Sequence, residues 1–328
     1  MSNTITNTTN TTNTTNTTTT TTIAFVFLVR SRIHPSWKKF FQSSQSTTQS
    51  TSQSRLPPNV SIHIHSSDPP TSLAEDDYYP YYYPHPIPTA WGSLSQVEAI
   101  NLVLLQAYLQ TSASLFFHAS EACYPLLNLD DFCRSLSTHA PRGYLYYRPD
   151  SSRWKPAHKS LGITDPSSFL KMRAQGWAFP RSVVAILLQY RDSLKYFTST
   201  VCPTEHVYVN ILTSHGIKLD DYFVNRPLAF FNWDDSNCTK HPKLYLDREV
   251  TSAFIDNLIS RNYLILRKVQ PSLPFQPGSS LTPTPTPTST PKTPTPKHIN
   301  NSTSNLHLSS TLTIHDKFSI LDQILTSI

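Results

Sequence analysis

One carboxylate with a histidine beside it stands out in the second half of the sequence. Glu205 and His206 lie in the stretch CPTEHVYVNIL, after a Cys-Pro pair and before an apolar run. Thr204 is a residue type that caps helices, which would place Glu205 in a first helical turn, where an acid stabilises the helix dipole by about 0.3–1 kcal/mol. A carboxylate is also a suitable general base for removing a hydroxyl proton. The stretch alone leaves both interpretations open.

The elements that would position this carboxylate begin with alternating strands and helices. Runs rich in β-branched and aromatic residues predict strands, and apolar side chains at helical spacing predict the helices between them. Ser95 and Glu98 have the spacing of a capping box. In chain order the sequence predicts strand 23–29, a short helix around Trp37, strand 59–65, helix 91–109, strand 114–120 and a helix from residue 129.

This alternation predicts a parallel α/β sheet. In open sheets of this kind, ligands bind beyond the carboxyl ends of the strands. Two polar stretches, HSSD at 65–68 and SEACYPL at 120–126, fall at those ends. We therefore expect the site to include one or both of them.

The second half of the sequence is mixed. One helix is expected to run through Val183 and Leu187, and the helix after Glu205 is expected to stop at Gly216. LAFFNWDD at 228–235 is typical of a strand, and REVTSAFIDNLIS at 248–260 of an amphipathic helix. The final strand, YLILRKV at 263–269, carries two adjacent cations near its end.

Low-complexity tracts set the expected domain boundaries. Residues 1–22 are almost wholly Asn and Thr, and the tail at 271–328 contains TPTPTPTSTPKTPTP. Such tracts bury too little apolar surface to offset chain entropy, so both ends are predicted to be disordered. The folded domain is expected at 23–270, with polar insertions near 42–58 and 69–90.

Composition excludes several classes of protein. The net charge is +6, the basic residues are scattered, and no nucleic-acid-binding motif occurs, so we expect no nucleic-acid partner. The charge suits a site for phosphates or simply a soluble surface. The 4 cysteines lack Cys-x-x-Cys spacing, which leaves buried thiols or disulfides open. No apolar stretch reaches 18 residues, and IAFVFLV is a poor signal peptide, so no anchor helix is predicted.

The order of the motifs resembles the core-2/I-branching β-1,6-N-acetylglucosaminyltransferase family (glycosyltransferase family 14), in particular its plant-type branch. The resemblance covers about residues 23–270. The stretches that carry it, in chain order, are IAFVFLVRSRIHPSWKKFF, NVSIHIHSSD, WGSLSQVEAINLVLLQAYL, FFHASEACYPLLNLDDF, KMRAQGWAFPRSVV, CPTEHVYVNIL and FNWDDSNCTKHPKLYLDREVTSAFIDNL with LILRKV.

The resemblance implies a GT-A-like nucleotide-sugar fold, with a central, mostly parallel sheet flanked by helices. It also implies an inverting transfer of N-acetylglucosamine or another sugar from a UDP-sugar to a hydroxyl of a glycan or glycoprotein. The family works without a divalent metal, so no cofactor is expected. The chain has Asp-Asp pairs but no Asp-x-Asp motif, which agrees with a metal-free site. An inactive glycan-binding homologue and a transferase with a different donor remain alternatives.

The resemblance also implies roles for particular residues. Glu205 matches the position of the catalytic base, and Arg267 and Lys268 match the basic residues that bind the donor diphosphate. The other candidates are Lys243 for the diphosphate, Ser66 and Asp68 for the nucleotide, and Trp177, Trp233 and Arg173 for the acceptor. Each has a structural alternative, such as core packing for the tryptophans or a solvated strand end for the cations. Trp91 is expected in the core, and Glu121 is expected to hold the turn after its strand.

Family members are usually anchored in the Golgi membrane. The resemblance therefore implies a Golgi or other secretory-pathway location and association with a membrane. The sequence printed here begins with an Asn/Thr tract instead of an anchor helix. Residues 141–168 match the family only loosely, so the identity of the acceptor stays open.

Overall fold

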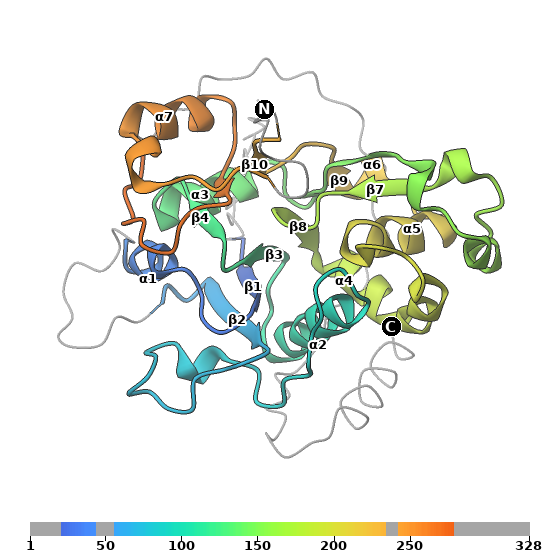
Figure 1. Ribbon diagram of the computed structural model, residues 1–328, viewed down its shortest axis with the longest axis horizontal. Helices are drawn as coiled ribbons and strands as arrows, with labels where there is room; N and C mark the ends of the chain where they lie inside the picture. The colour runs from blue at the N-terminus through green and yellow to red at the C-terminus, as the bar shows by residue number, and fades with distance from the viewer. Residues whose placement is uncertain (1–20, 44–55, 234–241, 279–328) are drawn as a thin grey trace, which may run out of the picture.

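The structure is a computed structural model that describes residues 21–43, 56–233 and 242–278 (Figure 1). Most of the two end tracts predicted to be disordered, at 1–22 and 271–328, and most of the polar insertion at 42–58 lie outside these ranges, as does Cys238. Cys123, Cys133 and Cys202 are free thiols.

The centre of the fold is a six-stranded mixed sheet with the order β2-β1-β3-β8-β5-β9. β1 pairs in parallel with β2 and β3, and β9 pairs in parallel with β5, whereas β8 runs antiparallel to both β3 and β5. The mostly parallel α/β sheet predicted from the sequence is thus confirmed. The strands are β1 Ile23–Val29, β2 Val60–Ser66, β3 Leu115–Ser120, β5 Gly143–Tyr144, β8 Trp177–Pro180 and β9 Phe223–Val224.

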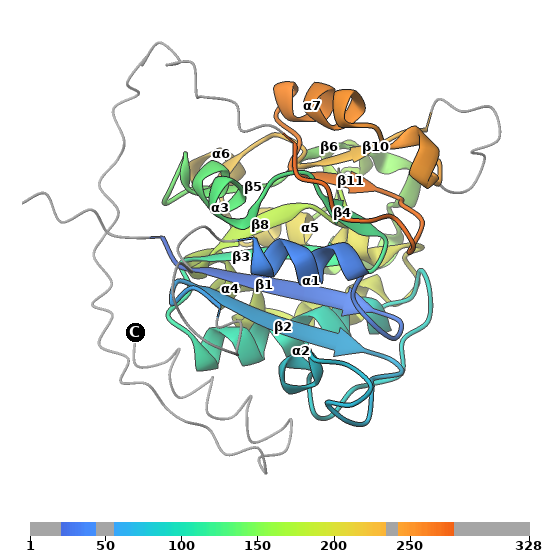
Figure 2. The same cartoon turned by 90° about the vertical axis from the view of Figure 1, so that its left-hand side faces the viewer.

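Helices cover both faces of this sheet, which explains why β1 is apolar at every position (Figure 2). Phe25 of β1 packs with α1 and α3 on one face, where its ring meets Trp37 at 6.2 Å and Phe132 at 5.8 Å. Val26 packs with α2 and α4 on the other face. These helices are α1 Pro35–Gln42, α2 Ser95–Gln110, α3 Leu129–Ser137 and α4 Arg181–Gln189.

The capping box expected at the start of α2 does not form. Leu94 occupies the N-cap and makes no side-chain cap. Ser95 Oγ instead accepts a hydrogen bond from Ala90 N at 3.0 Å, and Gln96 Oε1 accepts one from Gly92 N at 2.9 Å. These polar side chains therefore hold the loop before the helix, which lies at the cavity described below.

A second, three-stranded sheet with the order β10-β11-β4 brings the last described strand next to the first half of the chain. β4 follows β3 directly, so the end of β11 lies beside the end of β3. A two-stranded sheet pairs β6 with β7. The remaining strands and α-helices are β4 Cys123–Pro125, β6 Tyr147–Pro149, β7 Leu170–Met172, α5 Val207–Ser214, α6 Leu219–Tyr222, β10 Ala229–Phe231, α7 Ser252–Ser260 and β11 Ile265–Arg267.

Two segments are more integrated than the sequence suggested. In the 69–90 insertion, Asp76 is buried and pairs with Lys38 of α1 at 2.8 Å. In the expected tail, residues 271–278 pack on the domain: Leu273 is buried, and Gly278 N bonds to Leu126 O at 2.9 Å. Apolar side chains in both segments cover the α1 side of the core, which stabilises ordered backbone there.

Candidate active site

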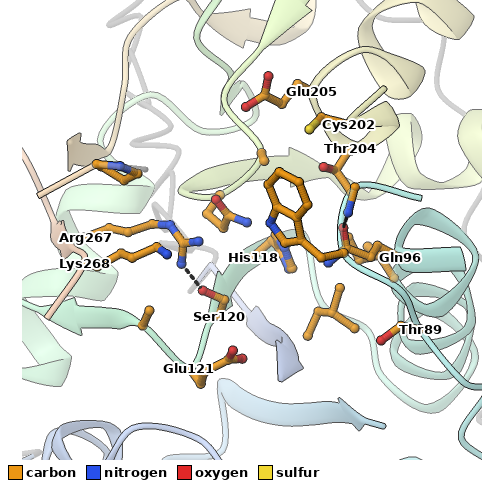
Figure 3. A pocket seen from close by; sticks show the side chains of 18 of the residues that line it. Thr89, Gln96, His118, Ser120, Glu121, Cys202, Thr204, Glu205, Arg267 and Lys268 are labelled. Carbon is orange, nitrogen blue, oxygen red and sulfur yellow. Dashed lines mark hydrogen bonds between the residues drawn. The ribbon is translucent and has the colours of Figure 1, made fainter. Parts of the chain in front are cut away.

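A cavity of about 770 Å³ opens at the carboxyl ends of β1, β2 and β3 (Figure 3). Arg30, Ser67 and Glu121 line it, and each follows one of these strands, as expected for an α/β sheet. The other polar side chains that line the cavity are Thr89, Gln96, His118, Ser120, Arg153, Lys171, Gln175, Cys202, Thr204, Glu205, Arg267 and Lys268.

Glu205 does not lie in the first turn of α5. It ends a short 3-10 turn, Pro203–Glu205, that precedes the helix, and its backbone N bonds to Cys202 O at 2.9 Å. α5 begins only at Val207, so Glu205 lies outside its first turn. Stabilisation of that helix dipole therefore does not explain the position of the carboxylate. Its partner is Lys171, whose Nζ lies 3.0 Å from Glu205 Oε2.

The turn that carries Glu205 is tied to the loop before α2. Cys202 has a φ of 53°, a left-handed conformation that non-glycine residues rarely adopt. Its backbone N bonds to the carbonyl of Gly92 at 3.1 Å, and Gly92 itself has a φ of 70°. Two loops that are distant in sequence thus fix one wall of the cavity, and unusual backbone of this kind is frequent at functional sites.

His206 anchors the same turn from behind. Its ring is buried, Nδ1 donates to Leu170 O at 3.0 Å, and the ring stacks on Phe169 at 5.1 Å. Burial lowers the pKa of His206 below its usual value. His206 is not among the described residues that line the cavity, and its ring packs behind the turn.

Arg267 and Lys268 reach the cavity from the end of β11. Arg267 Nη1 donates a hydrogen bond to Ser120 Oγ, at the end of β3, and its guanidinium lies 6.0 Å from the ring of Phe231 (Figure 3). Burial and the neighbouring Arg267 lower the pKa of Lys268, while Glu121 opposes that shift. Two cations therefore stand side by side in a partly desolvated place, where they would bind an anion strongly.

Glu121 has more than the expected structural role. Its Oε2 accepts a hydrogen bond from Arg30 N at 3.2 Å, which joins the ends of β1 and β3. The same carboxylate lines the cavity close to Lys268.

Several sequence-predicted site residues lie elsewhere. Lys243 pairs with Glu249 at 2.7 Å and does not line the cavity. Ser66 is buried, and its hydroxyl shares one proton between the carbonyls of Arg30 and Ser31, at 2.9 and 2.8 Å, while Asp68 is exposed. Because neighbouring side chains point in different directions, Ser67 is the residue of HSSD that faces the cavity.

The tryptophans that are buried and those that are exposed at the cavity also differ from the expectation. Trp177 is fully buried, with its ring stacked against His118 at 4.7 Å and Phe179 at 4.0 Å, so it has no face left for a sugar. Trp91, expected in the core, is 74% exposed at the cavity, and Trp233 is 48% exposed there. The short loop before α2 leaves the Trp91 side chain outside the sheet-helix interface.

Arg173, predicted to contact the acceptor, is held by aromatic rings. Its guanidinium lies 4.6 Å from the Phe231 ring and 5.5 Å from the Tyr146 ring, and burial lowers its pKa. It is absent from the described residues around the cavity, whereas Lys171 two residues earlier is present. Lys171 lies in β7, whereas Arg173 follows the end of that strand, where its guanidinium packs against the two aromatic rings.

Residues that were not predicted to belong to the site complete the cavity. Gln96, Arg153 and His118 are the main examples. His118 lies inside a run that reads as an ordinary buried strand, and Arg153 lies in an irregular segment that matches the family loosely. Only the position of His118, close to the carboxyl end of a predicted strand, could have indicated that it belongs to the site.

The described part of the chain shows neither a metal site nor a membrane-spanning helix. In the described ranges, no group of three or more His, Cys, Asp or Glu residues is arranged to hold a metal ion. Helices in that part of the chain are all too short or too polar to span a membrane.

No curated protein matches the chain. A family model described as Core-2/I-Branching enzyme matches residues 23–259, which include the six-stranded sheet and the cavity residues except Arg267 and Lys268. The chain therefore belongs to the core-2/I-branching enzymes, a family of metal-independent β-1,6-N-acetylglucosaminyltransferases with a GT-A-like fold.

Proposed function

We propose that this protein transfers N-acetylglucosamine from UDP-N-acetylglucosamine to a hydroxyl of an acceptor glycan or glycoprotein, with inversion at the anomeric carbon. One observation carries the proposal: Glu205 and the pair Arg267–Lys268 line different sides of one cavity (Figure 3). An inverting displacement needs a base on one side of the reacting carbon and stabilisation of the leaving group on the other.

The proposed reaction is a single displacement. Glu205 removes the proton of the acceptor hydroxyl while the hydroxyl oxygen forms a bond to the anomeric carbon. The bond from that carbon to the diphosphate oxygen breaks, and UDP leaves with the electron pair. Lys171, 3.0 Å from the carboxylate, orients Glu205 toward the acceptor.

In this proposal Arg267 and Lys268 stabilise the negative charge that develops on the leaving diphosphate. Ser120 fixes the guanidinium of Arg267 by its hydrogen bond, so the cation is in place before the reaction. Fixed cations in a partly buried site supply the stabilisation that a divalent metal gives in other transferases. We infer from this that UDP release needs no added metal.

The acceptor is proposed to lie against the exposed aromatic rim. Trp91 and Trp233 both line the cavity and are among the most exposed large apolar side chains described. Exposed apolar surface around a cavity is typical of a binding site, and the flat apolar face of a sugar ring suits an indole. Membership of the plant-type branch and residence in a Golgi or other secretory membrane are further parts of the proposal, based on the family alone.

A donor screen tests the proposal directly. The purified full chain is incubated with a panel of nucleotide sugars and acceptor glycans, with and without a chelator, and the released nucleotide is measured. We expect UDP release from UDP-N-acetylglucosamine that depends on the acceptor and is unchanged by the chelator. Absence of UDP release from every donor would support an inactive homologue. Turnover of another UDP-sugar would replace the donor, and activity only with manganese would refute the metal-free mechanism.

A further inference from the structure

His118 is a buried imidazole that the proposed mechanism does not use, although it lines the active-site cavity. We propose that His118 Nε2 accepts a hydrogen bond from a hydroxyl or amide N–H group of the transferred sugar, and so makes His118 a residue that selects the donor. This inference rests on the proposed function and adds a sugar contact to it.

Its hydrogen bonding leaves one nitrogen for a ligand. Nδ1 lies 3.1 Å from Val26 O, and because a carbonyl only accepts hydrogen bonds, Nδ1 must carry the proton. In the neutral ring, Nε2 then has a lone pair and no proton. Within the described parts of the chain, no hydrogen bond to Nε2 occurs, and Nε2 is not among the enclosed polar atoms that lack a partner. It therefore keeps contact with the cavity.

The ring is held rigidly in this orientation. It stacks on Trp177 with centroids 4.7 Å apart and ring planes at 25°, and its backbone carbonyl accepts a hydrogen bond from Gly176 N at 3.0 Å. Burial lowers the pKa of His118 to about 3, and Arg267 adds to the effect. At neutral pH the ring is thus uncharged, and Nε2 can accept a hydrogen bond but not donate one.

The position of His118 points to the sugar and not to the diphosphate. The ring lies at the end of β3, two residues before Ser120, which holds Arg267. In Figure 3 it lies beside the Arg267–Ser120 contact, and Glu205 lies apart from both. The transferred sugar must occupy the space between the leaving diphosphate and the base, and an acceptor on the floor of that space meets its hydrogen-bond donors.

Leaving such a buried acceptor unpaired is unfavourable, so a ligand that satisfies it gains selectivity. The test measures the affinities of UDP and UDP-N-acetylglucosamine for the full chain by calorimetry, in the wild type and in His118→Leu, His118→Gln and His85→Leu. His85 is an exposed histidine outside the cavity lining and serves as the control. We expect His118→Leu to bind the UDP-sugar about 10-fold more weakly, with unchanged UDP affinity, since about 1.4 kcal/mol corresponds to a factor of 10.

His118→Gln retains an acceptor near the same point and should recover most of the affinity for the UDP-sugar. An equal loss for UDP and the UDP-sugar would assign His118 to the nucleotide, and no loss for either would remove it from the site; both outcomes overturn the inference. Wild-type turnover of the UDP-sugar alongside either result would leave the proposed function standing. A wild type that binds neither ligand would overturn the proposed function and this inference with it.

A second measurement does not depend on the variants folding. The wild type is titrated with UDP-sugar analogues that lack one hydrogen-bond donor of the sugar at a time. We expect one analogue to bind about 10-fold more weakly, and His118→Leu to bind that analogue as well as it binds the parent sugar. Equal wild-type affinity for all analogues would contradict a sugar contact at His118.

Discussion

Lys171 Nζ lies 3.0 Å from Glu205 Oε2, which joins strand β7 to the turn before α5. The two side chains are 34% and 31% exposed, so the pair stands at the edge of the cavity, where an acceptor would approach. A pair so placed contributes little to stability, about 0–1 kcal/mol. Its main consequence is geometric, because it restricts where the Glu205 carboxylate points.

Replacing Glu205 with Gln should remove the base and leave the donor site intact. We expect kcat to fall about 100- to 10,000-fold, the contribution typical of general base catalysis, while the UDP affinity changes little. Turnover is measured by UDP release and binding by calorimetry. Glu98→Gln, on the exposed side of α2 and away from the cavity, is the matched control and should behave like the wild type.

Should Glu205→Gln retain full turnover, the base must lie elsewhere. Glu121 is the other carboxylate among the described residues that line the cavity, so Glu121→Gln would be the next variant to measure.

Replacing Lys171 with Met should lower kcat by about fivefold or less, because an ion pair this exposed is worth about 1 kcal/mol at most. UDP affinity should not change, since Lys171 faces Glu205 and not the diphosphate cations. Lys171→Arg keeps the charge and should restore most of the rate. A loss as large as that of Glu205→Gln would instead give Lys171 a direct part in the reaction.

The pH dependence of UDP binding should report Lys268. Burial, followed by Arg267, lowers the pKa of Lys268, and the diphosphate binds the protonated ammonium. UDP affinity is therefore complete below this pKa and falls as the pH rises through it, earlier than for an ordinary lysine. Lys268→Arg should abolish this dependence, because a guanidinium stays charged. Dissociation constants are measured for the wild type and Lys268→Arg from about pH 7 upward. The uracil ring of UDP titrates equally in both measurements, so the difference between the two curves reports the ionisation of Lys268.

Glu121 raises the pKa of Lys268, so Glu121→Gln should move the loss of UDP affinity to lower pH. Parallel curves for the wild type and Lys268→Arg would show that Lys268 does not bind the diphosphate.

Two glycines with left-handed backbone should respond differently to alanine. Gly176 has a φ of 72°, and a Cβ there would lie 2.6 Å from Ala229 Cβ of β10. Gly216, after α5, has a φ of 76° but no atom within 4 Å of such a Cβ. We expect Gly216→Ala to lose about 1 kcal/mol of the free energy of unfolding from backbone strain alone, and Gly176→Ala about 1–3 kcal/mol more from overpacking. Urea denaturation of both variants measures the difference, and equal losses would contradict it.

Short sequence patterns predicted those helices and strands that depend on only a few neighbouring residues. The apolar run 23–29 forms β1 with the bounds expected, and helix 129–137 forms as α3. Gly216 stops α5 as predicted: its N bonds to Thr213 O and Ile217 N bonds to Leu212 O, both at 3.0 Å, in a Schellman arrangement. The capping box at Ser95 failed because a loop contact competed for the same hydroxyl.

The amino-acid sequence by itself determined the α/β class, the edge of the sheet at which the cavity opens and the family whose model matches residues 23–259. Which side chains meet at that edge was decided by the tertiary structure. Ser120 and Arg267 lie 147 residues apart, yet the pairing of β4 with β11 puts them in contact. For the same reason, Trp177 is buried although it was predicted to contact the acceptor, and Trp91 is exposed although it was expected in the core. Periodicity and propensity act over a few residues, whereas the direction of a side chain at a strand end or in a loop is fixed by packing between distant segments.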